Sequence, residues 1–246
     1  MKVLVIGSTG GSGRAAVAHL RARGHEVTAF ARRPDPIAAA GAGAAASGGL
    51  RAIAGDVLDA AEVDAAVAGH DAVVVTLGIR ENALRVRLRG PAGTAADVRS
   101  VGTAHVVAAM ARHGVRRLVV QTSYGVGPTR DRLRWIERLF FALVLAPQIA
   151  DTERQQALVE ASALDWVVVQ PVHLIDGADD AAPFASTAGD TRRMKVTRAS
   201  VGRFLAQAVD APDYHRTCVA LSGAPAAARS LAPVAPVAGR RGTSVA

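Results

Sequence analysis

The chain has 246 residues, of which 50% are apolar, with 29 Lys and Arg against 21 Asp and Glu and a mean hydropathy of +0.21. A chain of this size and composition can bury a full hydrophobic core, which excludes disorder over most of its length. The most apolar window, residues 139–150, is interrupted by Pro147 and is shorter than the roughly 20 residues that span a bilayer. We therefore expect no membrane segment.

The formal net charge of +8 first suggests nucleic-acid binding, because neutralising phosphates drives such binding. The charges are not arranged for it: Lys2 and Lys195 are the only lysines, and the scattered arginines form no run with aromatic residues. We expect no nucleic-acid partner and instead attraction of an anionic cofactor.

Cys218 is the only cysteine and cannot form an internal disulfide, and the first residues lack the regions of a secretory signal. These features predict a reducing cytoplasm. The histidines at 70, 105, 113 and 215 have no metal-ligand spacing, so no metal site is expected. The expected partner is a small-molecule substrate, and the chain is expected to be a monomer or a homodimer.

Strand and helix patterns alternate along the chain. Strands are predicted at residues 2–6, 26–31, 50–54, 71–77, 117–121, 166–170 and 218–221, and helices at 11–23, 60–68, 95–113, 131–146, 148–162 and 200–209. A loop to about residue 190 and a short extended piece near 194–197 precede the last helix. This order predicts an α/β fold, a doubly wound and mostly parallel sheet with helices on both faces.

One Rossmann-like domain is expected to occupy residues 1–222, including a small C-terminal substrate region. Two segments lack its periodic pattern. Residues 36–49 are rich in Ala and Gly and read as a flexible insertion, and residues 223–246 read as a disordered tail.

The motif GSTGGSG at residues 7–13 stands between the first predicted strand and the first helix. Gly7 permits a tight turn, Gly10 lets the backbone approach a diphosphate closely, and Gly13 lets the helix pack on the sheet. The N–H groups of the first helical turn then face the phosphates, and the hydroxyls of Thr9 and Ser12 add donors. The motif predicts a dinucleotide site.

Arg32 and Arg33 follow the second strand, where the ribose 2′ position is recognised. Guanidinium groups bind phosphate through paired, charge-assisted hydrogen bonds. NADP(H) is therefore preferred over NAD(H), which stays as the alternative cofactor. Solvated surface arginines are the competing interpretation.

Short-chain dehydrogenases commonly use a Tyr with a Lys four residues later, and neither tyrosine has one: Pro128 follows Tyr124 and Cys218 follows Tyr214 at that spacing. There is also no GxSxG elbow and no Walker lysine, which excludes the common hydrolase and phosphoryl-transfer sites.

Polar residues follow the fifth and sixth strands, at the sheet edge where such folds bind ligands. Ser123 is a candidate to polarise a substrate carbonyl, His173 to relay a proton, and Tyr124 to face the substrate. Structural roles for all three remain as alternatives. Trp135, with the phenylalanines at 140 and 141, forms either a substrate wall or a packing face.

With these motifs, the chain resembles the atypical short-chain dehydrogenase/reductase superfamily, in the branch that includes biliverdin reductase B (flavin reductase) and NmrA-like proteins. The resemblance covers residues 1–222 and is carried by residues 7–13, 54–78, 106–123 and 158–177. The region 124–150 departs from biliverdin reductase B, so the resemblance does not identify the substrate.

The resemblance implies a set of cofactor contacts. It assigns the diphosphate to Thr9, Gly10, Gly11 and Ser12, the 2′-phosphate to Arg32, the adenine to Asp56 and Val57, the path to the nicotinamide to Leu77, Gly78 and Arg80, and the nicotinamide neighbourhood to Thr122, Ser123, Pro171, Val172 and His173.

The leading hypothesis is an NADPH-dependent reductase that transfers hydride to a conjugated carbonyl, quinone or flavin-type molecule. Two alternatives stay open. One is an NmrA-like regulator that senses NADP without turnover, and the other is a biosynthetic enzyme that uses the scaffold for a non-redox step such as isomerisation, dehydration or coupling.

Overall fold

The structure is a computed structural model that describes residues 1–34, 49–78, 93–133, 146–177 and 182–224. Several sequence predictions lie outside these residues: Arg80, the aromatic residues at 135, 140 and 141, and nearly all of the predicted insertion and tail.

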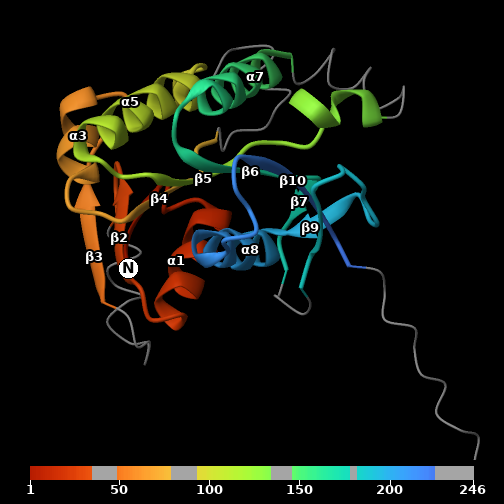
Figure 1. Cartoon of the computed structure of the whole chain (residues 1–246), viewed down its shortest axis with the longest axis horizontal. Coiled ribbons are helices and arrows are strands. Elements are labelled where there is room, and N and C mark those ends of the chain that lie inside the picture. Colours follow the sequence, from red (N-terminus) through yellow and green to blue (C-terminus); the bar gives the residue numbers. More distant parts are fainter. Residues whose placement is uncertain (35–48, 79–92, 134–145, 178–181, 225–246) are drawn as a thin grey trace, which may run out of the picture.

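The centre of the protein is an eight-stranded sheet in the order β3-β2-β1-β4-β5-β6-β10-β8 (Figure 1). Its strands are β1 (Lys2–Ile6), β2 (Glu26–Ala31), β3 (Leu50–Ala54), β4 (Ala72–Val75), β5 (Arg117–Gln121), β6 (Asp165–Pro171), β8 (Phe184–Ser186) and β10 (Thr217–Ser222). All neighbours pair in parallel except β10 with β8. The predicted doubly wound, mostly parallel sheet is confirmed.

Two layers of helices enclose the sheet. Helices α1 (Gly11–Ala22) and α8 (Arg198–Asp210) cover one face, and α3 (Ala60–Val67), α5 (Val98–His113) and α7 (Ala146–Ala161) cover the other (Figure 1). The chain leaves β1 in one direction through β2 and β3 and returns to β4 on the other side of β1. The order of the strands therefore reverses between β1 and β4, which is where open α/β sheets bind ligands.

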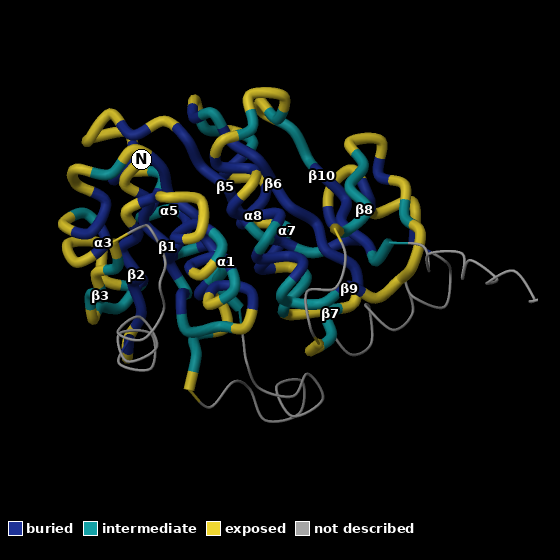
Figure 2. The backbone as a smooth tube through the Cα atoms, turned by 90° about the horizontal axis from the view of Figure 1, so that it is seen from below, coloured by how far each residue is buried: buried dark blue, intermediate teal, exposed yellow. Residues whose placement is uncertain are grey.

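The central strands are buried on both faces, which explains their nearly continuous apolar sequences. In β1, Val3 and Val5 pack in the cluster under α1 and α8, whereas Leu4 and Ile6 pack in the cluster under α3, α5 and α7. All four side chains are fully buried, and Figure 2 shows the buried strands running through the middle of the molecule. This alternation fixes the register of the strands, and therefore the face of the sheet on which each residue at a strand end lies.

The structure corrects the sequence prediction in three places. Pro147 does not separate two helices but is the second residue of α7, where its missing N–H leaves no intrahelical bond unmade. Pro171 is the last residue of β6, whereas the sequence predicted that the strand ends before it. Proline is tolerated at this position because no residue of β5 pairs with it. The expected loop after β6 contains β7 (His173–Ile175), which pairs with β9 (Lys195–Thr197), and also β8.

The start of the predicted helix at 131–146 belongs to a 3-10 helix, η1 (Gly127–Arg132). Most of the rest of that prediction lies outside the described residues.

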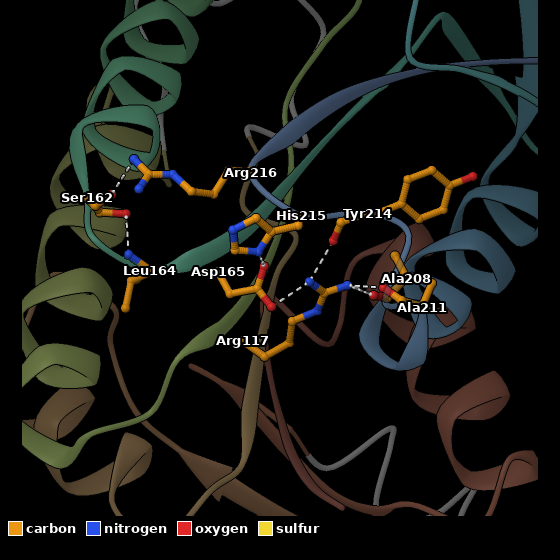
Figure 3. Close-up of polar contacts among 9 residues, drawn as sticks. All are labelled: Arg117, Ser162, Leu164, Asp165, Ala208, Ala211, Tyr214, His215 and Arg216. Atoms are coloured by element: carbon orange, nitrogen blue, oxygen red, sulfur yellow. Dashed lines mark hydrogen bonds and ion pairs between the residues drawn. The ribbon is translucent and has the colours of Figure 1, made fainter.

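At the opposite end of the sheet from the glycine turn, the buried Arg117 joins β5 to the end of α8 (Figure 3). Its guanidinium donates to the carboxylate of Asp165, at 2.9 Å, and to three carbonyl oxygens, those of Ala208, Ala211 and Tyr214. Those carbonyls are the free acceptors at a helix C-terminus and the residues after it. One side chain therefore satisfies acceptors from two layers of the fold.

Replacing Arg117 with Met should lower the free energy of unfolding by about 2–4 kcal/mol, because the carbonyls and Asp165 lose a buried charged donor. Urea denaturation followed by circular dichroism measures this. Arg116→Met is the matched control, since Arg116 is exposed on the preceding residue, and it should change stability by less than about 0.5 kcal/mol. Equal effects of the two substitutions would contradict the role of this network.

Candidate active site

An open pocket of about 120 Å³ lies at the carboxyl ends of β1, β2, β3 and β4 and reaches the start of α5. Eight of the residues predicted to bind the cofactor line it: Gly7, Thr9, Gly10, Arg32, Asp56, Val57, Leu77 and Gly78. These residues come from four separate segments of the chain, and the sheet brings their ends to one edge. The predicted diphosphate residues Gly11 and Ser12 and the packing residue Gly13 stand in the first turn of α1, directly after this pocket wall.

The glycine turn is packed tightly against the end of β4. Gly7 has φ +79°, a backbone conformation that favours glycine, and a Cβ at this position would lie 2.7 Å from the carbonyl oxygen of Thr76. A Cβ on Gly13 would lie 2.4 Å from the carbonyl oxygen of Gly7. The missing side chains let the turn and the helix approach the sheet, so that the start of α1 faces the pocket.

The start of α1 differs from the starts of α3 and α8. Gly10 is its N-cap, and among the described residues no side chain accepts a hydrogen bond from the N–H groups of its first turn as a cap. By contrast, Asp59 caps α3 and Thr197 caps α8 through their side chains. Uncapped N–H groups at a helix start bind an anion well, because the donors and the helix dipole act together.

Arg32 lies at the rim of the pocket and connects the end of β2 to the segment before α5. Its guanidinium donates to the carbonyl oxygen of Gly93, at 2.6 Å, and to the hydroxyl of Thr94, at 3.4 Å, on the segment that leads into α5. Thr94 also lines the pocket. Arg33 is exposed and is not among the residues that line the pocket.

The predicted adenine contacts follow β3. The carboxylate of Asp56 accepts the N–H of Leu58 at 3.0 Å, which holds the turn between β3 and α3. Val57 is buried, and its carbonyl oxygen is 3.0 Å from Nδ1 of His105 on α5. These bonds fix the wall of the pocket opposite the glycine turn.

The segment that follows β5 lies beside the end of β6. The N–H of Thr122 donates to Val169 at 2.8 Å, and the N–H of Tyr124 donates to Pro171 at 3.0 Å. Because of this pairing, the two predicted groups of residues, 122–124 and 171–173, meet at the same edge of the sheet as the pocket.

The polar side chains of these two loops have different surroundings. Ser123 is half-buried, and its hydroxyl donates to the carbonyl oxygen of Tyr124 at 3.1 Å. His173 is exposed at the start of β7. The ring of Tyr124 lies in the core, and its hydroxyl donates to Gly189 at 3.2 Å, a placement that favours the packing interpretation. Pro171 and Val172 are buried.

A buried glutamine pair holds the loop after β5. Gln156 on α7 accepts from the hydroxyl of Thr122, at 3.4 Å, and from the side-chain amide of Gln170, at 3.0 Å. Gln170 also donates to the carbonyl oxygen of Val126 at 2.7 Å. The nearby Cys218 is unsuited to nucleophilic chemistry, because burial and the neighbouring Glu160 raise the pKa of its thiol to about 12.

Sequence reasoning missed three residues near the pocket. Thr76 lines it and donates to the carbonyl oxygens of Ile6 and Gly7, at 3.1 and 3.2 Å. Arg99 on α5 lies beside Gly78, which lines the pocket, and Asp151 on α7 accepts the backbone N–H of Arg99 at 3.0 Å. Of these three residues, only Thr76 could have been found from the sequence, because it directly follows an apolar strand.

Within the described residues, no three His, Cys, Asp or Glu side chains could hold one metal ion. None of the helices in this part of the chain is long and apolar enough to cross a membrane.

The geometry of the pocket agrees with a family comparison. The sequence profile of a family described as NAD(P)H-binding matches residues 7–212. The chain belongs to this NAD(P)H-binding family. The glycine cradle and the uncapped start of α1 fit the diphosphate of such a cofactor, and the residues lining the pocket fit its adenosine half.

The curated proteins to which this chain is similar include one reductase. The 3-diazoavenalumate denitrifying reductase of a Streptomyces species is 38% identical over 125 residues, which cover 50% of this chain and 38% of that protein. Other curated relatives are 28% identical over 194 residues, and the chain spans only 21% of their length.

Solved structures show the same fold. The anaerobillin reductase ChuY from Escherichia coli O157:H7 has a TM-score of 0.71 and 21% identity, with 90% of this chain and 97% of that chain covered. A wide-type short-chain dehydrogenase/reductase from Veillonella parvula, in complex with NADP, has a TM-score of 0.67 and 14% identity, covering 92% and 95% of the two chains.

Two glycine substitutions should separate cofactor binding from folding in this family member. A Cβ on Gly10 would come no closer than 3.3 Å to its nearest neighbour, so Gly10→Ala should fold and weaken NADP(H) binding about tenfold by obstructing the diphosphate. Gly13→Ala should instead lower the melting temperature, because its Cβ would overlap Gly7. Calorimetric titration and thermal denaturation measure the two effects. Unchanged affinity in Gly10→Ala would place the diphosphate elsewhere.

Proposed function

We propose that this protein is an NADPH-dependent reductase that transfers hydride to a conjugated carbonyl, quinone or flavin-type small molecule. The observation that carries the proposal is the uncapped start of α1 beside a pocket that Arg32 lines, at the same edge of the parallel sheet as the segment after β5 and the end of β6. The names of two relatives, a denitrifying reductase and an anaerobillin reductase, support the reductase class.

Arg32 supports the preference for NADPH. Its guanidinium has five N–H donors, and the bonds to Gly93 and Thr94 hold it at the rim while leaving donors for a 2′-phosphate. No carboxylate stands on the residues directly after β2 within the described part, where an NAD-preferring site commonly has one. The Veillonella parvula relative was solved with NADP, which is consistent with this choice.

The residues at the strand ends would orient the acceptor. A bound reduced nicotinamide supplies the hydride, and the acceptor then needs a proton and a group that polarises its oxygen. Ser123 would turn its hydroxyl from the carbonyl of Tyr124 to the acceptor oxygen, and the exposed His173 or water would deliver the proton. An electrophilic acceptor needs mainly proximity and orientation, so the missing Tyr/Lys pair is tolerable.

A regulator that binds NADP without turnover is the second candidate. It is favoured by one observation: the hydroxyl of Ser123 is bonded to the adjacent carbonyl, and the hydroxyl of Tyr124 is bonded in the core. A non-redox enzyme on this scaffold would likewise bind the cofactor without oxidising NADPH.

Arg32→Ala should weaken NADPH binding about 10- to 100-fold and leave NADH binding within about twofold, because only NADPH carries the 2′-phosphate. Arg33→Ala is the matched control and should change neither affinity by more than about twofold. Fluorescence titration of both reduced coenzymes measures this. An equal loss for NADPH and NADH in Arg32→Ala would contradict the assignment.

NADPH oxidation, followed at 340 nm with quinones, flavins and conjugated ketones as acceptors, tests the reductase itself. Ser123→Ala should lower kcat by about 10- to 100-fold, whereas Tyr124→Phe should retain most of the rate because its hydroxyl lies in the core. Tight NADPH binding without oxidation by any acceptor would instead favour the regulator or the non-redox enzyme.

A further inference from the structure

Arg99, in the first turn of α5, is a half-buried arginine for which the proposed chemistry has no role. Its Nε is buried and has no hydrogen-bond partner, and within the described residues nothing accepts a hydrogen bond from the rest of its guanidinium. The guanidinium lies beside Gly78, which lines the pocket. A Cβ on Gly78 would be only 3.2 Å from Nη2 of Arg99, so the glycine makes room for this group.

The nearest acid, Asp151, does not neutralise this guanidinium by direct contact. Its carboxylate accepts the N–H groups of Arg99 and Ser100, at 3.0 and 3.2 Å, and the hydroxyl of Ser100 at 2.5 Å. Asp151 thus serves the start of α5 and acts on the guanidinium only through space. Burial lowers the pKa of Arg99, and the charge of Asp151 opposes that shift.

The buried Arg117, at the other end of the sheet, differs from Arg99 in having direct hydrogen-bond partners. The guanidinium of Arg117 also has an Nε without a partner, but its two terminal nitrogens donate to one carboxylate and three carbonyls. A buried charge without contacts is costly, and proteins normally pair such a charge. A half-buried arginine whose Nε is buried, which lies beside a pocket-lining glycine and has no acceptor within the described residues, indicates a partner that comes from outside the chain.

We propose that Arg99 binds an oxyanion of the acceptor, so that the preferred acceptor is a conjugated molecule that carries a carboxylate. The guanidinium offers the planar, paired donors that carboxylates and phosphates accept. This inference rests on the proposed reductase function and narrows its class of substrates.

The position of Arg99 favours the acceptor over the coenzyme as the source of the oxyanion. The diphosphate is expected at the start of α1, which covers one face of the sheet, whereas α5 covers the opposite face. Gly78 follows β4, which is the neighbour of β5, and β5 leads to Ser123. An anion at Arg99 therefore lies on the side of the strand ends away from α1.

Calorimetric titration with benzoate, and with benzamide as its neutral counterpart, tests the inference without requiring turnover. Titrations are made with and without saturating NADP⁺, which occupies the phosphate sites. Benzoate should bind the wild type, and Arg99→Met should weaken this at least tenfold, while benzamide should bind both proteins equally weakly. Arg112→Met is the matched control, because Arg112 lies on the same helix but is exposed and paired with Asp64.

Two further measurements separate the alternatives. Arg99→Met should leave NADPH affinity within twofold and should not lower the melting temperature, because it removes a buried charge that has no partner. Equal benzoate binding by wild type and Arg99→Met, or a loss of NADPH affinity with unchanged benzoate binding, would overturn the inference; the second result would assign the guanidinium to a phosphate of the coenzyme. Failure of the wild type to bind NADPH would overturn the proposed function, and the titrations without coenzyme would still test Arg99.

Discussion

The contact on which the site depends is the packing of the first glycine turn against the end of β4. Thr76 donates to the carbonyls of Ile6 and Gly7, and the missing side chain of Gly13 lets α1 approach the same carbonyl of Gly7. This packing directs the free N–H groups of α1 into the pocket. Because β1 and β4 are the strands between which the sheet order reverses, the same contact joins the two halves of the site.

The sequence predicted the sheet, and eight of the residues it proposed for cofactor binding line one pocket, for a physical reason. Strands buried on both faces need continuous apolar segments, and β1 and β4 have them. The glycine turn and Arg32 follow such strands directly, so the strand ends determine where they lie. Pro147 shows where local rules fail: proline ends a helix in its interior but is tolerated in its first turn, and the sequence does not state which applies.

Other features arise from contacts between distant segments and have no local signal. Asp151 accepts bonds from residues 99 and 100, about fifty positions earlier in the chain, and Gln156 joins β5 to β6. The strands β7 and β8 are three residues each and are stabilised by their partners β9 and β10, not by their own sequence pattern.

The helix starts and the arginines of this protein obey the same rule. Where the chain supplies an acceptor, as Asp59 does for α3, Asp151 for α5 and the end of α8 for Arg117, the polar group serves the fold. The start of α1 lacks a side-chain cap and the guanidinium of Arg99 lacks an acceptor within the described residues; Gly10 at the start of α1 lines the pocket, and Arg99 lies beside Gly78, which lines it too. Groups that the fold leaves without partners cost stability unless a ligand completes them, so two such groups at or beside the residues of one pocket are a stronger indication of binding than either group alone.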